Sequence, residues 1–400
     1  MLRRFDRWFT YSIIETAVEF GQSPTENSTL RPSGDDFRTI WQKPGHPTVL
    51  QIIDQRKLPH EYVTQDLETW EDGAAAIRDM QVRGAPLIGA TAAWSLYLAA
   101  VAEQDAEVCG AFVLSAADAL AETRPTAVNL RWALDRMRKV IVGCRPDDLV
   151  QCLEDEARAI CDEDVEISRG IGMQGLTLIE EISARKKGDA VNILTHCNAG
   201  ALATINYGTA TAPVYFAHAK GIKVHVWVDE TRPRNQGSQL TAWELAENNV
   251  PHTLIVDNAG GYLMQQGLVD ICITGTDRTT RNGDVANKIG TYLKALAAKD
   301  NDIPFYVALP STTIDWMMTD GLKNMPIEER DPSEVREIYG RAGNELCAVN
   351  TVASNTPVSN FAFDVTPAHL VTGLITECGI CEASENGLSG LFPNLASHTG

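Results

Sequence analysis

The sequence predicts an α/β protein with a mainly helical first part and a second part built on a parallel sheet. Before residue 187, apolar residues recur at helical spacing over long stretches. After it, short apolar runs alternate with helical patterns, which is typical of parallel strands joined by crossover helices. The 400 residues are enough for two domains and a large core.

In the first part, a few strands are expected before the helices. Residues 49–63 suggest short strands around a Pro-containing turn. A helix is predicted after Thr126, a candidate N-cap, because the apolar residues between 130 and 141 share one helical face. A bend is expected at residues 170–172, where two glycines fall inside a helical pattern. The other predicted helices cover residues 66–81, 86–103, 109–122 and 147–184.

Residues 1–36 are interpreted as an N-terminal extension or the product of a misassigned start. This segment has turn formers and acids but little periodicity. Its arginines suggest a targeting peptide, whereas its acidic residues do not suit one.

Composition excludes some classes of partner. The formal net charge of −19 argues against a nucleic-acid partner that needs a broad basic surface, and against docking on an anionic membrane. Residues 85–102 carry no charge and meet the crude length of a membrane span. Their Ala, Gly and Ser content predicts a buried helix instead.

The nine cysteines show no even spacing and follow no clear secretory signal. They are therefore predicted to be reduced thiols of a cytoplasmic protein. Cys378 and Cys381 form a C-x-x-C pair, but neither a second pair nor a histidine follows at zinc-like spacing. Their spacing is interpreted as coincidence.

No cofactor or metal is predicted. The loop after the first apolar run lacks the G-x-G-x-x-G pattern of dinucleotide sites, and a Walker loop is absent. The eight histidines are scattered, without H-x-x-x-H or H-E-x-x-H spacing.

Polar residues follow the apolar runs of the second part, where a parallel sheet binds its ligands. Cys197 ends the first run, and Asp277 ends the fourth. Acids also end the second and third runs, at Asp229, Glu230 and Asp257.

The position of Cys197 in the sequence has two interpretations. A helix expected to begin near residues 198–201 would lower the pKa of its thiol and suit catalysis. Alternatively, Cys197 is a small buried hydrophobe, as most free cysteines are. His196 is expected to point to the opposite side of the strand, so it is not the partner of Cys197.

Donor-rich loops suggest a phosphate site. Asn287 and Lys288 form a compact donor pair, and Gly290 allows close approach of the backbone. Three further loops place arginines beside Gly or Pro, in RGAP at 83–86, RPTAVNL at 124–130 and DETRPRNQG at 229–237. Solvated surface arginines are the alternative.

Together these stretches resemble the methylthioribose-1-phosphate isomerase family, aldose–ketose isomerases of methionine salvage. The resemblance covers about residues 37–382. Its motifs, in order, are RGAPLIGA, RPTAVNLRWALDRM, LTHCNAG, DETRPRNQG with LTAWEL, GTDRTTRNGDVANKIGTY, IPFYVALP and NFAFDVTPAHLVTGLITE.

The resemblance implies a fold, a dimer and a set of site residues. It implies an α+β domain at 37–165, a Rossmann-like domain at 166–400 and a homodimer. It implies that Cys197 and Asp277 are catalytic. The substrate-binding residues that it implies are Arg83, Gly84, Ala85, Arg124, Gln236, Asn287 and Lys288. The chain departs from the family pattern at Arg234 and Asn235, where many members carry an aromatic residue and a leucine.

The reaction makes two chemical demands. The anomeric oxygen is locked in a phosphate ester, so an acid must help the ring oxygen leave; Asp277 suits this role if an apolar surrounding raises its pKa. A hydrogen must then move between C2 and C1, as a proton or as a hydride. A Cys197 thiolate would act as base in the first case, whereas a neutral thiol suits the second.

Two alternatives are carried forward. The substrate could be 5-deoxyribose 1-phosphate or ribose 1,5-bisphosphate, which would share the phosphate grip. The chain could also be a non-catalytic regulatory protein, because the regulatory subunits of the eukaryotic translation-initiation exchange factor share the fold.

Overall fold

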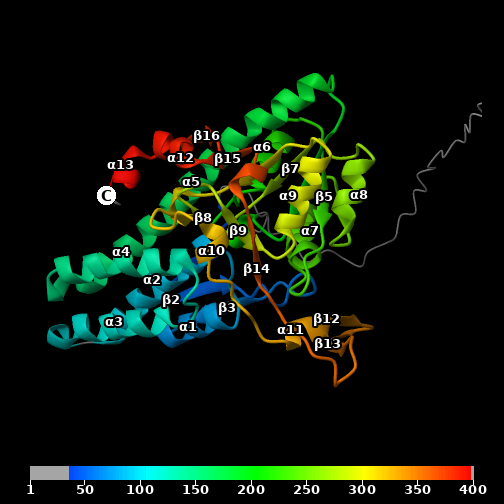
Figure 1. The fold of residues 1–400 in the computed structure, drawn as a ribbon. Helices are drawn as coiled ribbons and strands as arrows, with labels where there is room; N and C mark the ends of the chain where they lie inside the picture. The colour runs from blue at the N-terminus through cyan, green and yellow to red at the C-terminus, as the bar shows by residue number, and fades with distance from the viewer. Residues whose placement is uncertain (1–35, 104, 398–400) are drawn as a thin grey trace, which may run out of the picture.

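The computed structural model describes residues 36–103 and 105–397 and shows a mixed α/β fold with a helical first part, which confirms the predicted class (Figure 1). The proposed N-terminal extension therefore lies outside the described residues, apart from Asp36. A small antiparallel sheet comes first, in the order β1-β2-β3. Its strands are β1 at Ile40–Lys43, β2 at His46–Ile53 and β3 at Thr64–Leu67.

Helices α1 to α5 follow this sheet. The first helix begins later than predicted because Thr69 caps it: Thr69 Oγ1 accepts the Asp72 N–H, and the Asp72 carboxylate accepts the Thr69 N–H. The helices are α1 at Trp70–Arg78, α2 at Ala85–Ala102, α3 at Ala106–Ala121, α4 at Val128–Gly143 and α5 at Leu149–Arg185.

Helix α2 forms the centre of the helical part. Among the described residues it is the one helix long and apolar enough to cross a membrane, yet 83% of it is buried inside the protein. It packs against α1, α3, α4 and α5, which confirms the prediction of a buried core helix.

One local prediction in this part was wrong. Thr126 does not cap α4, because its hydroxyl donates to Glu328 and Ala127 occupies the N-cap position. The two glycines at which a bend was expected lie inside α5, which continues to Arg185. A Cβ on Gly172 would come within 2.6 Å of the Phe216 ring, so this glycine allows close packing of α5 against helix α6, Ala212–Ala219.

The large sheet has seven strands in the order β16-β15-β10-β7-β4-β5-β6. Six of them are parallel, in the 3-2-1-4-5-6 order of a doubly wound sheet, and β16 is antiparallel. All five predicted strands are present, but the sixth parallel strand, β15, was not predicted. The strands are β4 at Val191–His196, β5 at Val224–Asp229, β6 at His252–Ile255, β7 at Ile271–Thr274, β10 at Phe305–Ala308, β15 at Gly373–Thr376 and β16 at Gly379–Cys381.

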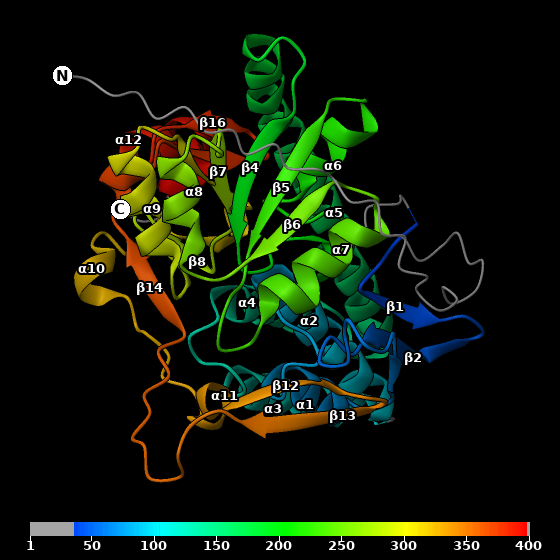
Figure 2. The same ribbon diagram turned by 90° about the vertical axis from the view of Figure 1, so that its right-hand side faces the viewer.

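Helices cover both faces of this sheet (Figure 2). On one face, Ile193 of β4 packs with residues of α5 and α6. On the other, Leu194 packs with helices α8, Ala259–Gln265, and α9, Thr291–Asp300. Helix α5 contributes to two cores, since its residues up to Val165 pack in the helical part and those from Ile171 pack against the sheet.

The remaining strands form a further sheet and a separate hairpin. A four-stranded sheet has the order β11-β8-β9-β14, and the hairpin β12–β13 lies apart from both sheets (Figures 1 and 2). These strands are β8 at Arg278–Thr280, β9 at Val285–Lys288, β11 at Ile314–Asp315, β12 at Glu337–Ala342, β13 at Glu345–Asn350 and β14 at Phe363–Thr366. The short helices are α7 at Ala242–Glu247, α10 at Gly321–Asn324, α11 at Ser333–Arg336, α12 at Glu385–Leu391 and α13 at Pro393–Ala396.

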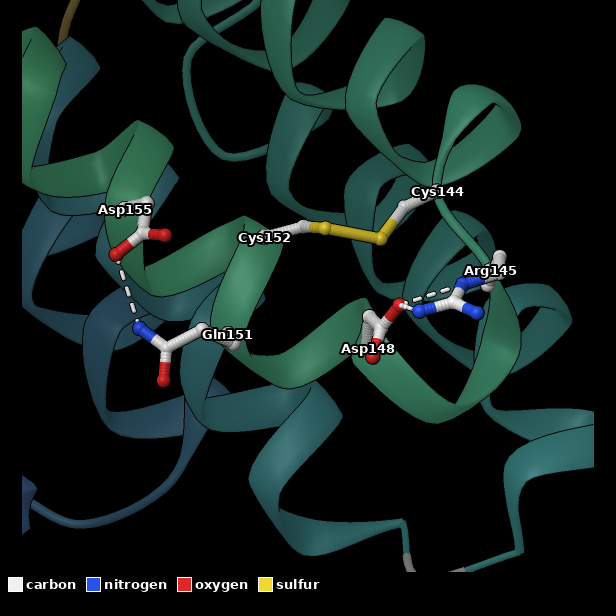
Figure 3. Close-up of a disulfide and its surroundings, with 6 residues drawn as sticks. All are labelled: Cys144, Arg145, Asp148, Gln151, Cys152 and Asp155. Atoms are coloured by element: carbon white, nitrogen blue, oxygen red, sulfur yellow. Dashed lines mark hydrogen bonds and ion pairs between the residues drawn. A yellow bond between two sulfur atoms is a disulfide. The ribbon is translucent and has the colours of Figure 1, made fainter.

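A disulfide between Cys144 and Cys152 contradicts the prediction that all nine cysteines are reduced (Figure 3). Cys144 caps the end of α4 and Cys152 lies in the first turn of α5. The turn at Pro146–Asp148 reverses the chain between them and brings their Cα atoms to 6.7 Å. The other seven cysteines are free.

Candidate active site

Cys197 and Asp277 line one small cavity at the carboxyl edge of the parallel sheet. Cys197 directly follows β4, and Asp277 follows β7. The cavity has a volume of about 30 Å³. Its lining includes four of the residues predicted to bind substrate, namely Arg83, Gly84, Ala85 and Asn287. The structure thus brings residues 83–85, Cys197 and Asp277 together, although these three places in the chain are 80 positions apart or more.

Cys197 is buried and has a strained backbone. Its φ of +66° lies in the left-handed region that residues with a Cβ rarely adopt. Two hydroxyls fix this conformation: the Cys197 N–H donates to Thr231 Oγ1 at 2.8 Å, and Thr241 Oγ1 donates to the Cys197 carbonyl at 2.6 Å. The thiol donates to Gln236 Oε1 at 3.3 Å. Strain that the surroundings enforce in this way is concentrated at functional sites.

The Cys197 thiol is neutral at neutral pH. Burial raises its pKa, and the charges of Arg83 and Lys288 offset only part of that rise. One of the two interpretations of Cys197 placed a helix near residues 198–201, whose dipole would lower this pKa. That helix does not form, because the chain makes only a short 3-10 turn at Ala201–Ala203.

Asp277 has the environment that an acid catalyst needs. Burial raises the pKa of its carboxyl group, while Lys288, Arg83 and Arg124 oppose the rise and Glu328 adds to it. Within the described part of the chain, no donor forms a hydrogen bond to this carboxyl group. It is therefore available to give a proton to a bound molecule.

The segment Arg83-Gly84-Ala85 directs a helix N-terminus at the same cavity. Gly84 has φ +93°, and a Cβ there would come within 2.3 Å of the Ala203 carbonyl oxygen, so only glycine fits. No side chain caps α2, which begins at Ala85. The first amides of α2 and the positive end of its dipole are therefore free to bind an anion.

The side chains of Arg124 and Lys288 also reach the site, and both have hydrogen-bond donors available for a ligand. Arg124 and Asp277 both line a second small cavity next to the first, and the buried Nε of Arg124 has no partner. The Lys288 ammonium is buried, its Nζ lies 4.8 Å from the centre of the Phe363 ring, and burial lowers its pKa. Asn287 donates to Thr291 Oγ1 at 3.0 Å, which orients its amide. These groups form a grip suited to a phosphate.

Gln236 connects this site to a larger cavity. Besides accepting the Cys197 thiol, it lines a cavity of about 480 Å³ together with Arg83. Arg234 and Asn235, the residues that depart from the family pattern, line the same cavity. This cavity has the volume of a small-molecule site.

Glu244 anchors the loop that carries Cys197, a role that no sequence pattern predicts. Its carboxylate accepts four hydrogen bonds, from Asn198 Nδ2, Tyr215 Oη and the amides of Ala201 and Leu202, all between 2.9 and 3.0 Å. Asn198 also accepts the guanidinium of Arg83, through its side-chain and backbone oxygens at 2.5 and 2.7 Å.

His196 belongs to a buried ion cluster. Its Nδ1 lies 2.7 Å from Asp229 Oδ2, and the Lys294 ammonium lies 2.6 Å from the same oxygen. Its Nε2 lies 2.9 Å from the carbonyl oxygen of Ile289, next to Lys288. No hydrogen bond joins His196 and Cys197 among the described residues, although both line the small cavity, and His196 fixes the loop at Ile289 beside Lys288.

No metal cluster is found in residues 36–103 and 105–397: no three His, Cys, Asp or Glu side chains there could hold a metal ion together. Cys378 and Cys381 are both free; Cys378 lies in the turn between β15 and β16, and Cys381 is the last residue of β16.

Comparison with known proteins identifies relatives over most of the chain. Residues 81–383 match the Initiation factor 2 subunit family. A methylthioribose-1-phosphate isomerase from Desulfatibacillum aliphaticivorans is 56% identical over 366 residues, which cover 91% of this chain and 99% of the relative.

Solved structures agree with this similarity. The 5-methylthioribose 1-phosphate isomerase from Pyrococcus horikoshii is 40% identical, with a TM-score of 0.77 over 89% of this chain and 96% of that chain. A structure described as the delta subunit of translation initiation factor eIF-2B from A. fulgidus is 38% identical, with a TM-score of 0.74 over 89% of this chain and 99% of that one.

Proposed function

The chain belongs to the methylthioribose-1-phosphate isomerase family, and we propose that it converts 5-methylthioribose 1-phosphate into 5-methylthioribulose 1-phosphate in methionine salvage. The observation that carries this proposal is the cavity that Cys197 and Asp277 line together with Arg83, Gly84, Ala85 and Asn287. Cys197 and Asp277 are the proposed catalytic residues. The proposed substrate-binding residues are Arg83, Gly84, Ala85, Arg124, Gln236, Asn287 and Lys288.

Asp277 is proposed to open the sugar ring. Its carboxyl group, whose pKa is raised by burial, gives a proton to the ring oxygen as the bond from that oxygen to C1 breaks. The phosphate ester oxygen supports the electron-poor C1. Arg83, Arg124 and Lys288 hold the phosphate in place.

Hydrogen transfer is proposed to follow the hydride route. The hydrogen moves with its electron pair from C2 to C1, and C2 becomes a carbonyl as its hydroxyl proton passes to the Asp277 carboxylate. The proton lent to the ring oxygen is thereby recovered. This route is favoured by the neutral thiol of Cys197, since a buried thiol with a raised pKa is a poor base. The sulfur then shields the reacting carbons from water.

Two experiments test the assignment. Cys197→Ala and Asp277→Asn should each abolish turnover but leave substrate binding measurable by calorimetry; near-normal kcat in either variant would contradict the roles given to them. Turnover in heavy water distinguishes the routes. A ketose without solvent deuterium at C1 supports the hydride route, whereas deuterium at C1 requires an enediolate and a basic Cys197.

The substituent at C5 is proposed to face the large cavity beside Gln236. Arg56, Lys57 and Arg234 line this cavity, and Met80 and Leu240 supply apolar surface. Because the two arginines and the lysine would pair with a second phosphate, ribose 1,5-bisphosphate is a competing candidate substrate. Comparing kcat/KM for the methylthio, 5-deoxy and bisphosphate sugars decides the matter, because a clear preference for the bisphosphate would overturn the proposal.

A non-catalytic regulatory role is the second candidate. It is favoured by the 38% identity to the structure described as an initiation-factor subunit. The intact Cys197, Asp277 and phosphate grip favour the enzyme. Turnover of the sugar phosphate by the purified chain distinguishes the two.

We also propose an organisation for the chain, with an α+β domain at residues 37–165 and a Rossmann-like domain at 166–400. The change of core along α5, between Val165 and Ile171, supports that boundary.

The chain is further proposed to form a homodimer in the cytoplasm, without a nucleic-acid or membrane partner. Exposed apolar side chains near and on α8 and α9 support a dimer, and sedimentation velocity tests it. The exposed apolar residues are Val256, Tyr262, Leu293 and Leu296.

The proposed cytoplasmic location rests on the relatives' metabolic role. The disulfide removes the argument from reduced thiols.

A further inference from the structure

Ion pairs of alternating charge run through residues 328–334 from one end of the candidate site to the other. The chain of ion pairs begins at Arg124, beside Asp277, and ends at Arg234, in the large cavity. The three residues between them are Glu328, Arg330 and Glu334. None of the three was singled out in the sequence, and the mechanism above does not use them.

Glu328 fixes the orientation of the Arg124 guanidinium. Its Oε2 accepts from Arg124 Nη2 at 2.9 Å and from Thr126 Oγ1 at 3.3 Å. Glu328 accepts from one terminal nitrogen of Arg124, while the buried Nε of Arg124 has no partner; Arg124 and Asp277 line the same cavity. A buried, unpaired guanidinium nitrogen is costly unless a ligand satisfies it.

Glu328 is itself held from the opposite side. Its Oε1 accepts from Arg330 Nη1 at 2.7 Å, and Arg330 forms a bidentate pair with Glu334. Burial alone would raise the pKa of Glu328, but Arg124 and Arg330 lower it below its ordinary value. Glu328 is therefore an anion at neutral pH.

The backbone of this segment is equally constrained. Arg232 donates to the carbonyl oxygens of Glu334 and Val335 at 3.1 and 2.9 Å. The amide of Arg330 donates to the Asn360 carbonyl at 2.9 Å. Glu328 thus has little freedom to move away from Arg124.

Resting on the proposed isomerase function, we propose that Glu328 is a positioning residue: it aims Arg124 Nε at the substrate phosphate and supplies a fixed negative charge near Asp277. Glu328 does not touch the reacting atoms in this assignment. It acts through Arg124, by geometry, and through Asp277, by charge.

The charge on Glu328 adds to the rise in the pKa of Asp277 that burial causes. The charged and titratable groups around the Asp277 carboxyl are Lys288 of β9, Arg83 before α2, Arg124 before α4, Cys197 after β4 and Glu328 itself. The three cations lower the pKa of Asp277, and Glu328 is the carboxylate that raises it. Removing this charge makes Asp277 lose its proton at a lower pH.

The test compares Glu328→Gln with Glu329→Gln. Glu329 is the adjacent exposed residue, and within the described chain its side chain forms no ion pair. For E328Q, KM for the sugar phosphate should rise by about 10-fold or more, because the amide cannot serve Arg124 and Arg330 as the carboxylate does. The alkaline limb of the kcat–pH profile should move to lower pH. E329Q should match the unmodified protein in both.

Glu328→Asp separates the two effects and serves if E328Q fails to fold. It restores the charge but shortens the reach, so KM should stay raised while the alkaline limb returns toward its original pH. Turnover by the unmodified chain together with an E328Q profile equal to that of E329Q would overturn the positioning role. A lack of turnover by the unmodified chain would instead overturn the proposed function on which this inference rests.

Discussion

Replacing Glu244 with Gln should loosen the loop that carries Cys197. The carboxylate lies on α7 and accepts four hydrogen bonds from groups around residues 198–215. The substitution keeps the size of the side chain and exchanges one acceptor oxygen for an NH₂ donor. Its effect therefore depends on which neighbours can reverse their role.

The magnitude follows from those neighbours. On the Oε1 side, Asn198 Nδ2 and the Leu202 amide can only donate. On the Oε2 side, the Tyr215 hydroxyl can rotate to accept, but the Ala201 amide cannot. The NH₂ group should therefore replace Oε2 and leave one buried donor unsatisfied, at a cost of about 1–3 kcal/mol in the free energy of unfolding. E244A strands all four donors and should cost several times more.

The assay combines urea unfolding with steady-state kinetics. E244Q should lower kcat/KM by about 10-fold, or about 1.4 kcal/mol, because the unsatisfied Ala201 amide loosens the loop that carries Cys197 and Asn198. Glu247→Gln, an exposed change on the same helix, should remain within about 0.5 kcal/mol of the parent. An E244Q protein with parental stability and parental kcat/KM would show that Glu244 does not anchor the loop.

Three further predictions concern stability. Replacing Cys144 and Cys152 with Ser should lower the free energy of unfolding, measured by urea titration, by about 2–3 kcal/mol under oxidising conditions. Under reducing conditions the variant and the parent should be equally stable. Burial raises the pKa of Asp164 from 3.8 to about 7, so the contribution of its protonated carboxyl group to stability is full below pH 3.8 and is lost as the pH rises through 7. D164N should therefore stabilise the protein at pH 8 relative to pH 4, by up to about 4 kcal/mol. An equal change in the free energy of unfolding at the two pH values would contradict this. Gly84→Ala should cost more than about 1 kcal/mol and abolish activity, since its Cβ would overlap Ala203; a thermally unchanged variant would show that α2 can begin differently.

How much of the fold the sequence predicts depends on how each element is made. Runs such as VNIL and ICIT are short, apolar and β-branched, and buried parallel strands need that composition. Strand β15, GLIT, was missed because it follows the irregular stretch at 367–372. The disulfide was missed because the chain reversal between α4 and α5 does not show in the cysteine spacing.

Only part of the candidate site could be predicted from the sequence. Cys197 and Asp277 could be located because strand ends meet at one edge of a parallel sheet. The residues that position Cys197 and Asp277 could not be located from the sequence. Glu328 is 204 residues from Arg124, and a glutamate in a charged segment looks like surface until the fold pairs it. Glu244 is equally unmarked on its helix, and the direction of the Cys197 pKa shift depended on a helix that does not form.

The charges of the site predict how substrate binding changes Asp277. Arg83, Arg124 and Lys288 carry three positive charges, Glu328 carries one negative charge, and Cys197 is neutral. With Asp277 protonated, these groups sum to about +2, which matches a phosphate monoester near −2 above its second pKa of about 6. Ionising Asp277 beside the bound phosphate would add a negative charge to a balanced site, so binding should raise the pKa of Asp277 further.

The alkaline pKa in the profile of kcat, which reports the complex, should therefore lie above that in the profile of kcat/KM, which reports the free enzyme. Both limbs fall as the pH rises, because the protonated form is the active one. D277N serves as the control, since its residual rate should lack both limbs. Coinciding alkaline pKa values would mean that the phosphate does not bind near Asp277, and the phosphate grip would then need to be placed elsewhere.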